Sequence, residues 1–217
     1  MDPRIELNTL ALAMVAVAVV EAAAALAGQA RLAPPLVLTG LIRLLETGLM
    51  LHITCSAVSG LAGLGLTRES LGPGLKKGLI WSAGFGLLAA LGLLSARAAD
   101  LDIKGLLQLR LPPRGWEIGL YFLVGGLVSP LAEEILFRGL IFGYCRRWGL
   151  AAALLASTLA FALAHLSAQQ RVFAPVTQVI GGLVFGLAYE RSRSLISPLI
   201  IHVLGNLAIF SLSFAFR

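Results

Sequence analysis

Charged residues are scarce in this chain. Only 13% of its 217 residues are Asp, Glu, Lys or Arg, whereas 58% are hydrophobic and the mean hydropathy is +0.90. A soluble domain of this size could not bury so much apolar surface, so an ordinary soluble protein is excluded and the chain needs lipid. Its length suffices for about seven or eight membrane spans of roughly 20 residues each, which leaves almost nothing for a separate soluble domain.

Cysteine is also rare, because Cys55 and Cys145 are the only two and each lies alone within or beside an apolar run. They indicate neither a disulfide framework nor a cysteine metal site. We also expect no cleavable secretory signal, since the chain opens with MDPR and then runs apolar for about a full span, which we interpret as a first transmembrane helix. The net charge of +6 does not predict a nucleic-acid partner, because Lys and Arg cluster at the ends of apolar runs, as topology signals and anionic-lipid contacts do.

Apolar runs bounded by charge, Pro or Gly predict an all-α, polytopic transmembrane helix bundle. The predicted helices lie at about 7–28, 35–66, 75–96, 116–145, 149–167, 173–189 and 195–215. The second run is too long for one straight span, so a tilted helix, a kinked helix and two short pieces stay open, and with them an eighth span. Arg43 and Glu46 in that run share a helix face and are interpreted as an intrahelical ion pair. The stretch 98–114 mixes charges with leucines, which suits a segment in the membrane interface.

The most informative stretch is 130–138, PLAEEILFR, because it puts two carboxylates and a guanidinium inside an otherwise apolar helix. Glu134 and Arg138 are four residues apart and can pair on one helix face. Glu133 points about 100° away from Glu134 and lacks that partner, so it is the free carboxylate and a candidate general base. The alternative is that both glutamates merely neutralise Arg138 and hold helices together.

Further polar side chains lie inside later helices. We take the helix that contains Glu133 to end near Arg146 and the next helix to start near Gly149, at the same membrane face. A rise of 1.5 Å per residue then places Glu133 about 20 Å and His165 about 24 Å from that face. The last helix starts at the same face, and His202 and Asn206 lie about 10 Å and about 17 Å along it. Because each polar group costs free energy in lipid, three helices that bring such groups to overlapping depths favour an active site over packing alone.

Three spaced motifs carry a resemblance to a known family. The chain contains, in this order, Glu133-Glu134-x-x-x-Arg138, Phe161-x-x-x-His165 and His202-x-x-x-Asn206. These motifs resemble those of CAAX prenyl protease 2 and the CAAX-protease and bacteriocin-processing (Abi) family. The resemblance covers about residues 116–210, with no departure at the signature positions. It implies a catalytic transmembrane core in 116–217. Residues 1–115 add nothing to the match, and their sequence pattern predicts N-terminal transmembrane helices and the interfacial segment.

The resemblance implies a glutamate-dependent intramembrane endopeptidase. In such an enzyme Glu133, helped by His165, activates a water that attacks the scissile carbonyl. His202 and Asn206 stabilise the oxyanion that forms. Supporting roles behind these groups fall to Glu134, Arg138 and Phe161.

A metal site is the alternative to this mechanism. Two histidines and a carboxylate, His165, His202 and Glu133, could bind Zn²⁺ and leave one position for water. The chain has no His-Glu-x-x-His helix, so the expectation is a protease without a cofactor.

The expected partners are the lipid bilayer and a membrane-anchored, lipidated or C-terminally tagged protein or peptide that is cleaved during maturation, sorting or CAAX-type processing. A non-proteolytic immunity or scaffold protein of the same fold is the rival, and loss of a signature residue would favour it; none is lost. A transporter would be expected to show internal repeats or half-helices, which the sequence does not. The Ala-, Leu-, Gly- and Arg-rich composition favours the inner membrane of a bacterium.

The distribution of Lys and Arg bears on orientation. Leaving aside the stretch 97–114, the loops on the N-terminal side hold eight Lys and Arg and the opposite loops hold three, which favours a cytoplasmic N-terminus. Counting that stretch almost erases the difference. A cytoplasmic N-terminus would put the glutamates closer to the outer face.

Overall fold

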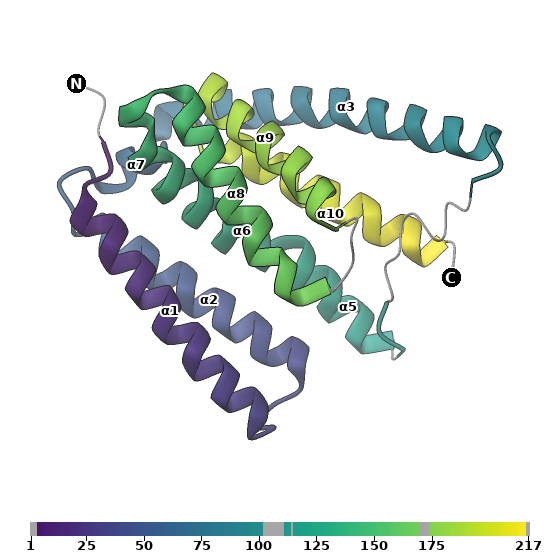
Figure 1. Cartoon of the computed structure of the whole chain (residues 1–217), viewed down its shortest axis with the longest axis horizontal. Helices are drawn as coiled ribbons and strands as arrows, with labels where there is room; N and C mark the ends of the chain where they lie inside the picture. The colour runs from purple at the N-terminus through teal and green to yellow at the C-terminus, as the bar shows by residue number, and fades with distance from the viewer. Residues whose placement is uncertain (1–3, 102–110, 114, 170–173, 216–217) are drawn as a thin grey trace.

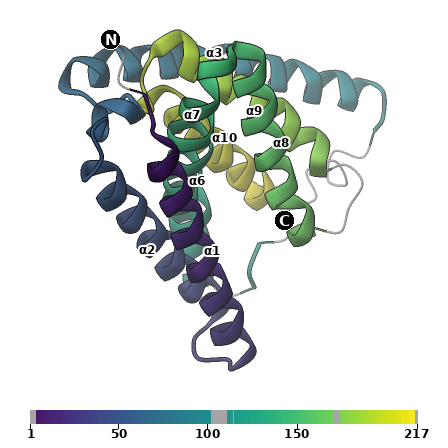
Figure 2. The ribbon, with the colours of Figure 1, turned by 60° about the vertical axis from the view of Figure 1, so that its left-hand side comes forward.

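The computed structural model describes residues 4–101, 111–113, 115–169 and 174–215, and these residues form helices and no strand. The all-α, polytopic helix bundle predicted from the sequence is therefore confirmed. Figures 1 and 2 show the helices gathered at the end that holds the N-terminus and spreading apart from there. The predicted interfacial stretch 98–114 lies largely outside the described residues.

Three long helices make up the N-terminal half. They are α1 (Leu7–Gln29), α2 (Pro35–Cys55) and α3 (Arg68–Ala98), with a short 3₁₀ helix, η1 (Gly60–Leu64), between α2 and α3. The long second apolar run is thus one helix that ends at Cys55 and a separate short turn. Pro35 opens α2 at a position where its missing N–H costs nothing, and Thr67 begins α3 with a capping box shared with Ser70.

One continuous helical segment, Gly115–Trp148, begins the C-terminal half. It consists of α5 (Gly115–Leu123), the π-helix η2 (Val124–Val128), α6 (Ser129–Glu134), the π-helix η3 (Ile135–Phe142), α7 (Gly143–Cys145) and the 3₁₀ turn η4 (Arg146–Trp148). It is followed by α8 (Leu150–Gln169), α9 (Ala174–Ser192) and α10 (Ile196–Ala215). All seven helical ranges predicted from the sequence are occupied, with ends that differ by up to about ten residues.

Five helical segments among the described residues are long and apolar enough to cross a membrane. They are Leu7–Gln29, Pro35–Cys55, Gly60–Ala98, Gly115–Trp148 and Ile196–Ala215. Leu150–Leu166 is a shorter apolar helix. Leucines and valines are exposed along the outer faces of these helices, as expected of surfaces that meet lipid.

The buried core joins both halves of the chain. One cluster packs Ile5, Met50 and Leu64 against Ile135 and other residues of the Gly115–Trp148 segment. Gly65 brings the two halves close together: its φ is +71°, and a Cβ there would lie 2.8 Å from the backbone oxygen of Arg193. The division into 1–115 and 116–217 therefore does not follow a break in packing, and it stays a prediction.

Glu6 ties the N-terminal segment to the link between α2 and η1. Its carboxylate accepts hydrogen bonds from Thr9 Oγ1 at 2.9 Å and from the backbone N–H of Ser59 at 3.1 Å. Burial acts to raise the pKa of Glu6, but the hydrogen bonds from Thr9 and Ser59 outweigh it and leave that pKa below its ordinary value. The start of α1 is thus fixed at the end of the bundle where the helices meet.

Candidate active site

The two glutamates lie in a segment that is not a regular α-helix. In a π-helix each N–H donates to the carbonyl five residues back, and the N–H of Ser129 does so to Val124 at the end of η2. Glu133 and Glu134 are the last residues of α6, directly between η2 and the second π-helix, η3. π segments are rare, and those that occur are often found at functional sites. Their presence on both sides of Glu133 and Glu134 therefore marks this short stretch as a candidate site.

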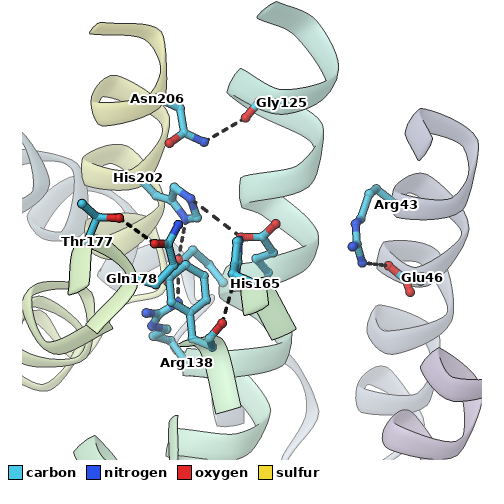
Figure 3. Close-up of polar contacts among 12 residues, drawn as sticks. Arg43, Glu46, Gly125, Arg138, His165, Thr177, Gln178, His202 and Asn206 are labelled. Atoms are coloured by element: carbon cyan, nitrogen blue, oxygen red, sulfur yellow. Dashed lines mark hydrogen bonds and ion pairs between the residues drawn. The ribbon is translucent and has the colours of Figure 1, made fainter. Parts of the chain in front are cut away.

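Pro130 leaves a gap in this hydrogen-bond pattern, and the last helix fills it. In the register set by Ser129 and Val124, the next donor would be residue 130 and its acceptor the carbonyl of Gly125. Proline has no N–H and cannot donate. Instead Asn206 Nδ2, on α10, donates to Gly125 O at 2.9 Å (Figure 3). Asn206 thus ties α10 to a carbonyl to which Pro130 cannot donate.

A buried chain of polar groups joins Arg138, Glu134 and His202. The side chains of Glu134 and Arg138 are fully buried, and Arg138 Nη1 donates to Glu134 Oε1 at 2.9 Å. His202 Nδ1 lies 2.7 Å from the same oxygen. A carboxylate paired with a guanidinium accepts hydrogen bonds, so the hydrogen between Glu134 and His202 is assigned to Nδ1. In the neutral imidazole, Nε2 of His202 is then an acceptor.

Aromatic rings enclose these hydrogen-bonded side chains. The Cζ atom of Arg138 lies 4.5 Å from the ring centroid of Phe161 and 5.0 Å from that of Phe185. Phe185 also stacks on His202, with centroids 4.7 Å apart and planes inclined by 21°. Cation–π attraction and exclusion of water therefore hold Arg138 and His202 in place. Phe185 was missed in the sequence, where a single Phe in an apolar helix looks like any packing residue.

Glu133 faces two histidines from two other helices. Its Oε2 lies 3.9 Å from His165 Nε2, on α8, and 3.8 Å from His202 Nε2, on α10. The side chains of Glu133 and His165 are 14% and 24% exposed, whereas that of Glu134 is fully buried. Adjacent carboxylates are thus separated into an accessible one and an enclosed one.

The tautomer of His165 follows from its other contact. His165 Nδ1 lies 2.8 Å from the carbonyl oxygen of Phe161, which can only accept, so Nδ1 carries the hydrogen. In the neutral ring Nε2 is an acceptor directed toward Glu133. Glu133 Oε2 and the two Nε2 atoms are therefore three acceptors, too far apart for direct hydrogen bonds and close enough for one bridging water.

The match to known families is confined to this part of the molecule. Residues 115–208 match the family model described as type II CAAX prenyl endopeptidase, Rce1-like. The range holds all seven residues of the three sequence motifs. Over these residues the chain is similar to the CAAX protease family. No curated protein and no solved structure matches the chain.

The similarity to the CAAX protease family, together with the apolar helices, makes this an integral membrane protein. The family supports an intramembrane endopeptidase of CAAX type in general. The donor atoms of Glu133, His165 and His202 are of the kind that Zn²⁺ accepts. Among the described residues, no group of three His, Cys, Asp or Glu side chains is arranged to hold a metal ion.

Two other sets of polar side chains stand apart from the three sequence motifs. Arg43 Nη1 donates to Glu46 Oε2 at 2.6 Å, as predicted (Figure 3). The same Nη1 also lies 3.1 Å from Glu21 Oε1 on α1. The contact between Arg43 and Glu21 joins α2 to α1. Gln178, on α9, accepts a hydrogen bond from Thr177 Oγ1 at 2.6 Å.

Proposed function

We propose that this protein is a glutamate-dependent intramembrane endopeptidase in which Glu133 activates the attacking water. The observation that carries the proposal is the position of Glu133 Oε2, 3.8 to 3.9 Å from the Nε2 atoms of His202 and His165. Both rings are oriented by hydrogen bonds at Nδ1, so their Nε2 atoms are held toward Glu133. Glu133 is also the more accessible of the two glutamates.

A water between Glu133 and His165 would donate one hydrogen to Oε2 and the other to Nε2, which turns its lone pairs outward. Attack on the scissile carbonyl transfers one proton to Glu133 and forms a tetrahedral intermediate. When the C–N bond breaks, Glu133 returns that proton to the leaving nitrogen. His165 acts as an acceptor that orients the water, because its Nδ1 hydrogen is committed to the Phe161 carbonyl.

The proposed oxyanion role constrains the protonation of His202. Its Nδ1 hydrogen is directed to Glu134, so Nε2 can donate to an oxyanion only when the ring is an imidazolium. The buried Glu134 carboxylate would stabilise that positive charge, while Arg138 holds Glu134 in place. Asn206 uses one of its two Nδ2 hydrogens on Gly125, and the other is the proposed second oxyanion donor.

The proposed substrate is a membrane-anchored, lipidated or C-terminally tagged protein that is cut near its C-terminus, and no cofactor is assigned. This rests on the CAAX endopeptidase family and on the depth of Glu133, about 13 residues or roughly 20 Å from the helix end at Arg146. The inner membrane of a bacterium is the proposed location.

Cleavage in cells tests the proposal. Cells carry the native protein, Glu133→Gln, or the control Glu69→Gln, which removes a carboxylate from the first turn of α3 far from the site in sequence. All three must be present in the membrane at equal level. New C-terminal ends among membrane proteins are then compared by peptide mass spectrometry.

Ends that appear with the native protein and Glu69→Gln but are lost with Glu133→Gln support the glutamate mechanism and also identify the substrate. The same ends in all three strains would contradict it. That result would favour a non-proteolytic immunity or scaffold protein of the same fold.

A further inference from the structure

A cavity of about 510 Å³ lies where the helices meet, outside the candidate active site. Its walls come from the N-terminal segment, the link between η1 and α3, the end of the Gly115–Trp148 segment and the end of α9. Both ribbon views show these parts at one end of the bundle. None of the residues of the three sequence motifs lines the cavity. Since Arg146 lines it, Glu133 is about 13 residues, or roughly 20 Å, away along the helix.

The lining is strongly cationic. The described charged residues around the cavity are Arg4, Arg146, Arg147, Arg193 and Glu190. Four guanidinium groups and one carboxylate give a net charge of +3. Glu190 is already shared, because Arg146 Nε and Nη2 donate to it at 2.9 and 2.8 Å and Arg193 Nη2 lies 3.3 Å from it. Among the described lining residues, guanidinium groups thus outnumber carboxylates, which favours the binding of an anion.

The geometry of the arginines suits a phosphate group. The bond to Glu190 engages two of the three guanidinium nitrogens of Arg146, and a guanidinium carries five N–H donors in all. The hydroxyl-bearing residues Thr67 and Ser70 also line the cavity, at the N-terminus of the 31-residue helix α3. The partial positive charge of that helix end adds to the attraction for an anion.

The surroundings place the cavity at the level of lipid headgroups. The candidate spans Leu7–Gln29 and Gly115–Trp148 begin and end beside it. Tyr144 and Trp148 pack edge to face with centroids 5.3 Å apart, and Trp148 is 63% exposed. Arg147, a lining residue, lies over the Tyr144 ring at 3.9 Å. An exposed Trp and a half-buried Tyr beside arginine at a helix end are typical of the membrane interface.

We propose that this cavity binds the phosphate headgroup of an anionic phospholipid, with Arg4 and Arg193 at its rim and Arg146 and Arg147 in its wall. The lipid would seal the N-terminal segment and the η1 link against the ends of α7 and α9. The proposal does not depend on the chemistry at Glu133.

Native mass spectrometry of the full chain in a neutral detergent tests this. The probes are dioctanoyl phosphatidylglycerol, dioctanoyl phosphatidylcholine and inorganic phosphate, so that headgroup charge and lipid chains are varied separately. The test variant is Arg4→Gln with Arg193→Gln. The control, Lys76→Gln with Arg191→Gln, removes the same charge from residues of the same end that do not line the cavity.

The expected result is preferential binding of phosphatidylglycerol, with affinity reduced about fivefold for each cavity arginine removed and hardly changed in the control. Equal loss in both double variants, or no loss in either, would overturn the proposal. Inorganic phosphate binding as tightly as phosphatidylglycerol would show a free-anion site and overturn the lipid assignment. If the double variant unfolds, Arg4→Gln alone, ahead of the first helix, gives the same test with a fivefold effect.

Discussion

At the scale of single residues, the burial of Arg138 explains much of the site. Its side chain is fully buried, and Nε and Nη2 have no hydrogen-bond partner within the described part of the chain. Its charge is matched by Glu134 and by the faces of Phe161 and Phe185. A guanidinium in this setting is costly, and we attribute its presence to its effect on Glu134 and, through Glu134, on His202.

Removing this cation should destabilise the protein more than removing the whole pair. Arg138→Met leaves the buried Glu134 carboxylate unpaired, which should cost about 3–5 kcal/mol. In the double variant with Glu134→Gln no buried charge remains and the amide oxygen still accepts from His202, so stability should return to within about 1 kcal/mol of native. Activity should stay low, because a neutral amide stabilises an imidazolium less. Thermal unfolding and peptide cleavage, measured on the same samples, check both; a stable Arg138→Met would contradict the account.

At the scale of helices, the junction of η2 and α6 links backbone geometry to the site. Pro130 cannot donate to Gly125 O, and Asn206 does so from α10. One amide thus both closes the backbone pattern and lies one turn from His202. These two roles can be separated experimentally.

Asn206→Leu should cost about 1–3 kcal/mol, because Gly125 O loses its donor in a partly buried place. Pro130→Ala restores a backbone N–H, so the double variant Pro130→Ala/Asn206→Leu should recover most of that stability. If Asn206 also donates to the oxyanion, cleavage remains depressed about 100-fold or more in the double variant. Full recovery of cleavage together with stability would show that Asn206 only supports the helix.

The helix start at Glu6 gives a prediction for pH. Its pKa is lowered in the folded protein, so its contribution to stability is present above the ordinary carboxyl pKa, 4.5, and is lost as pH falls through the lower folded value. Native protein should therefore melt above Glu6→Gln at pH 7, and the difference should shrink below about pH 4.5. Melting curves at a series of pH values check this, and a gap that persists at low pH would argue against a charged Glu6.

Much of this element-level structure could be predicted from the sequence, because apolar runs report helices directly. The Glu134–Arg138 and Arg43–Glu46 pairs follow from helical spacing alone. The split of the run 35–66 does not follow from the sequence, since hydropathy does not distinguish a helix from a turn within lipid. The π segments, the use of Asn206 on Gly125 and the ring of Phe185 depend on contacts between distant helices, which no local pattern encodes. The catalytic roles stay predictions.

At the scale of the whole molecule, the fold separates two polar regions. Carboxylates and imidazoles lie along the helices, at Glu133, His165 and His202, while the arginine-lined cavity lies where the helices meet. The shared core, from Ile5 to Leu195, holds the two regions in one structure. A cytoplasmic N-terminus stays a prediction. It would put the cavity on the cytoplasmic side of the membrane, where loops of membrane proteins carry an excess of Lys and Arg.

The central claim is that Glu133 acts as a general base on water. The most direct measurement is single-turnover cleavage of a substrate peptide by the full chain reconstituted in lipid, comparing native protein with Glu133→Gln, each with and without a metal chelator. The account predicts a loss of about 10²- to 10⁴-fold for Glu133→Gln, with equal folding by melting temperature, and no effect of the chelator on the native rate. Undiminished cleavage by Glu133→Gln, or loss of native cleavage on chelation that added zinc restores, would contradict it.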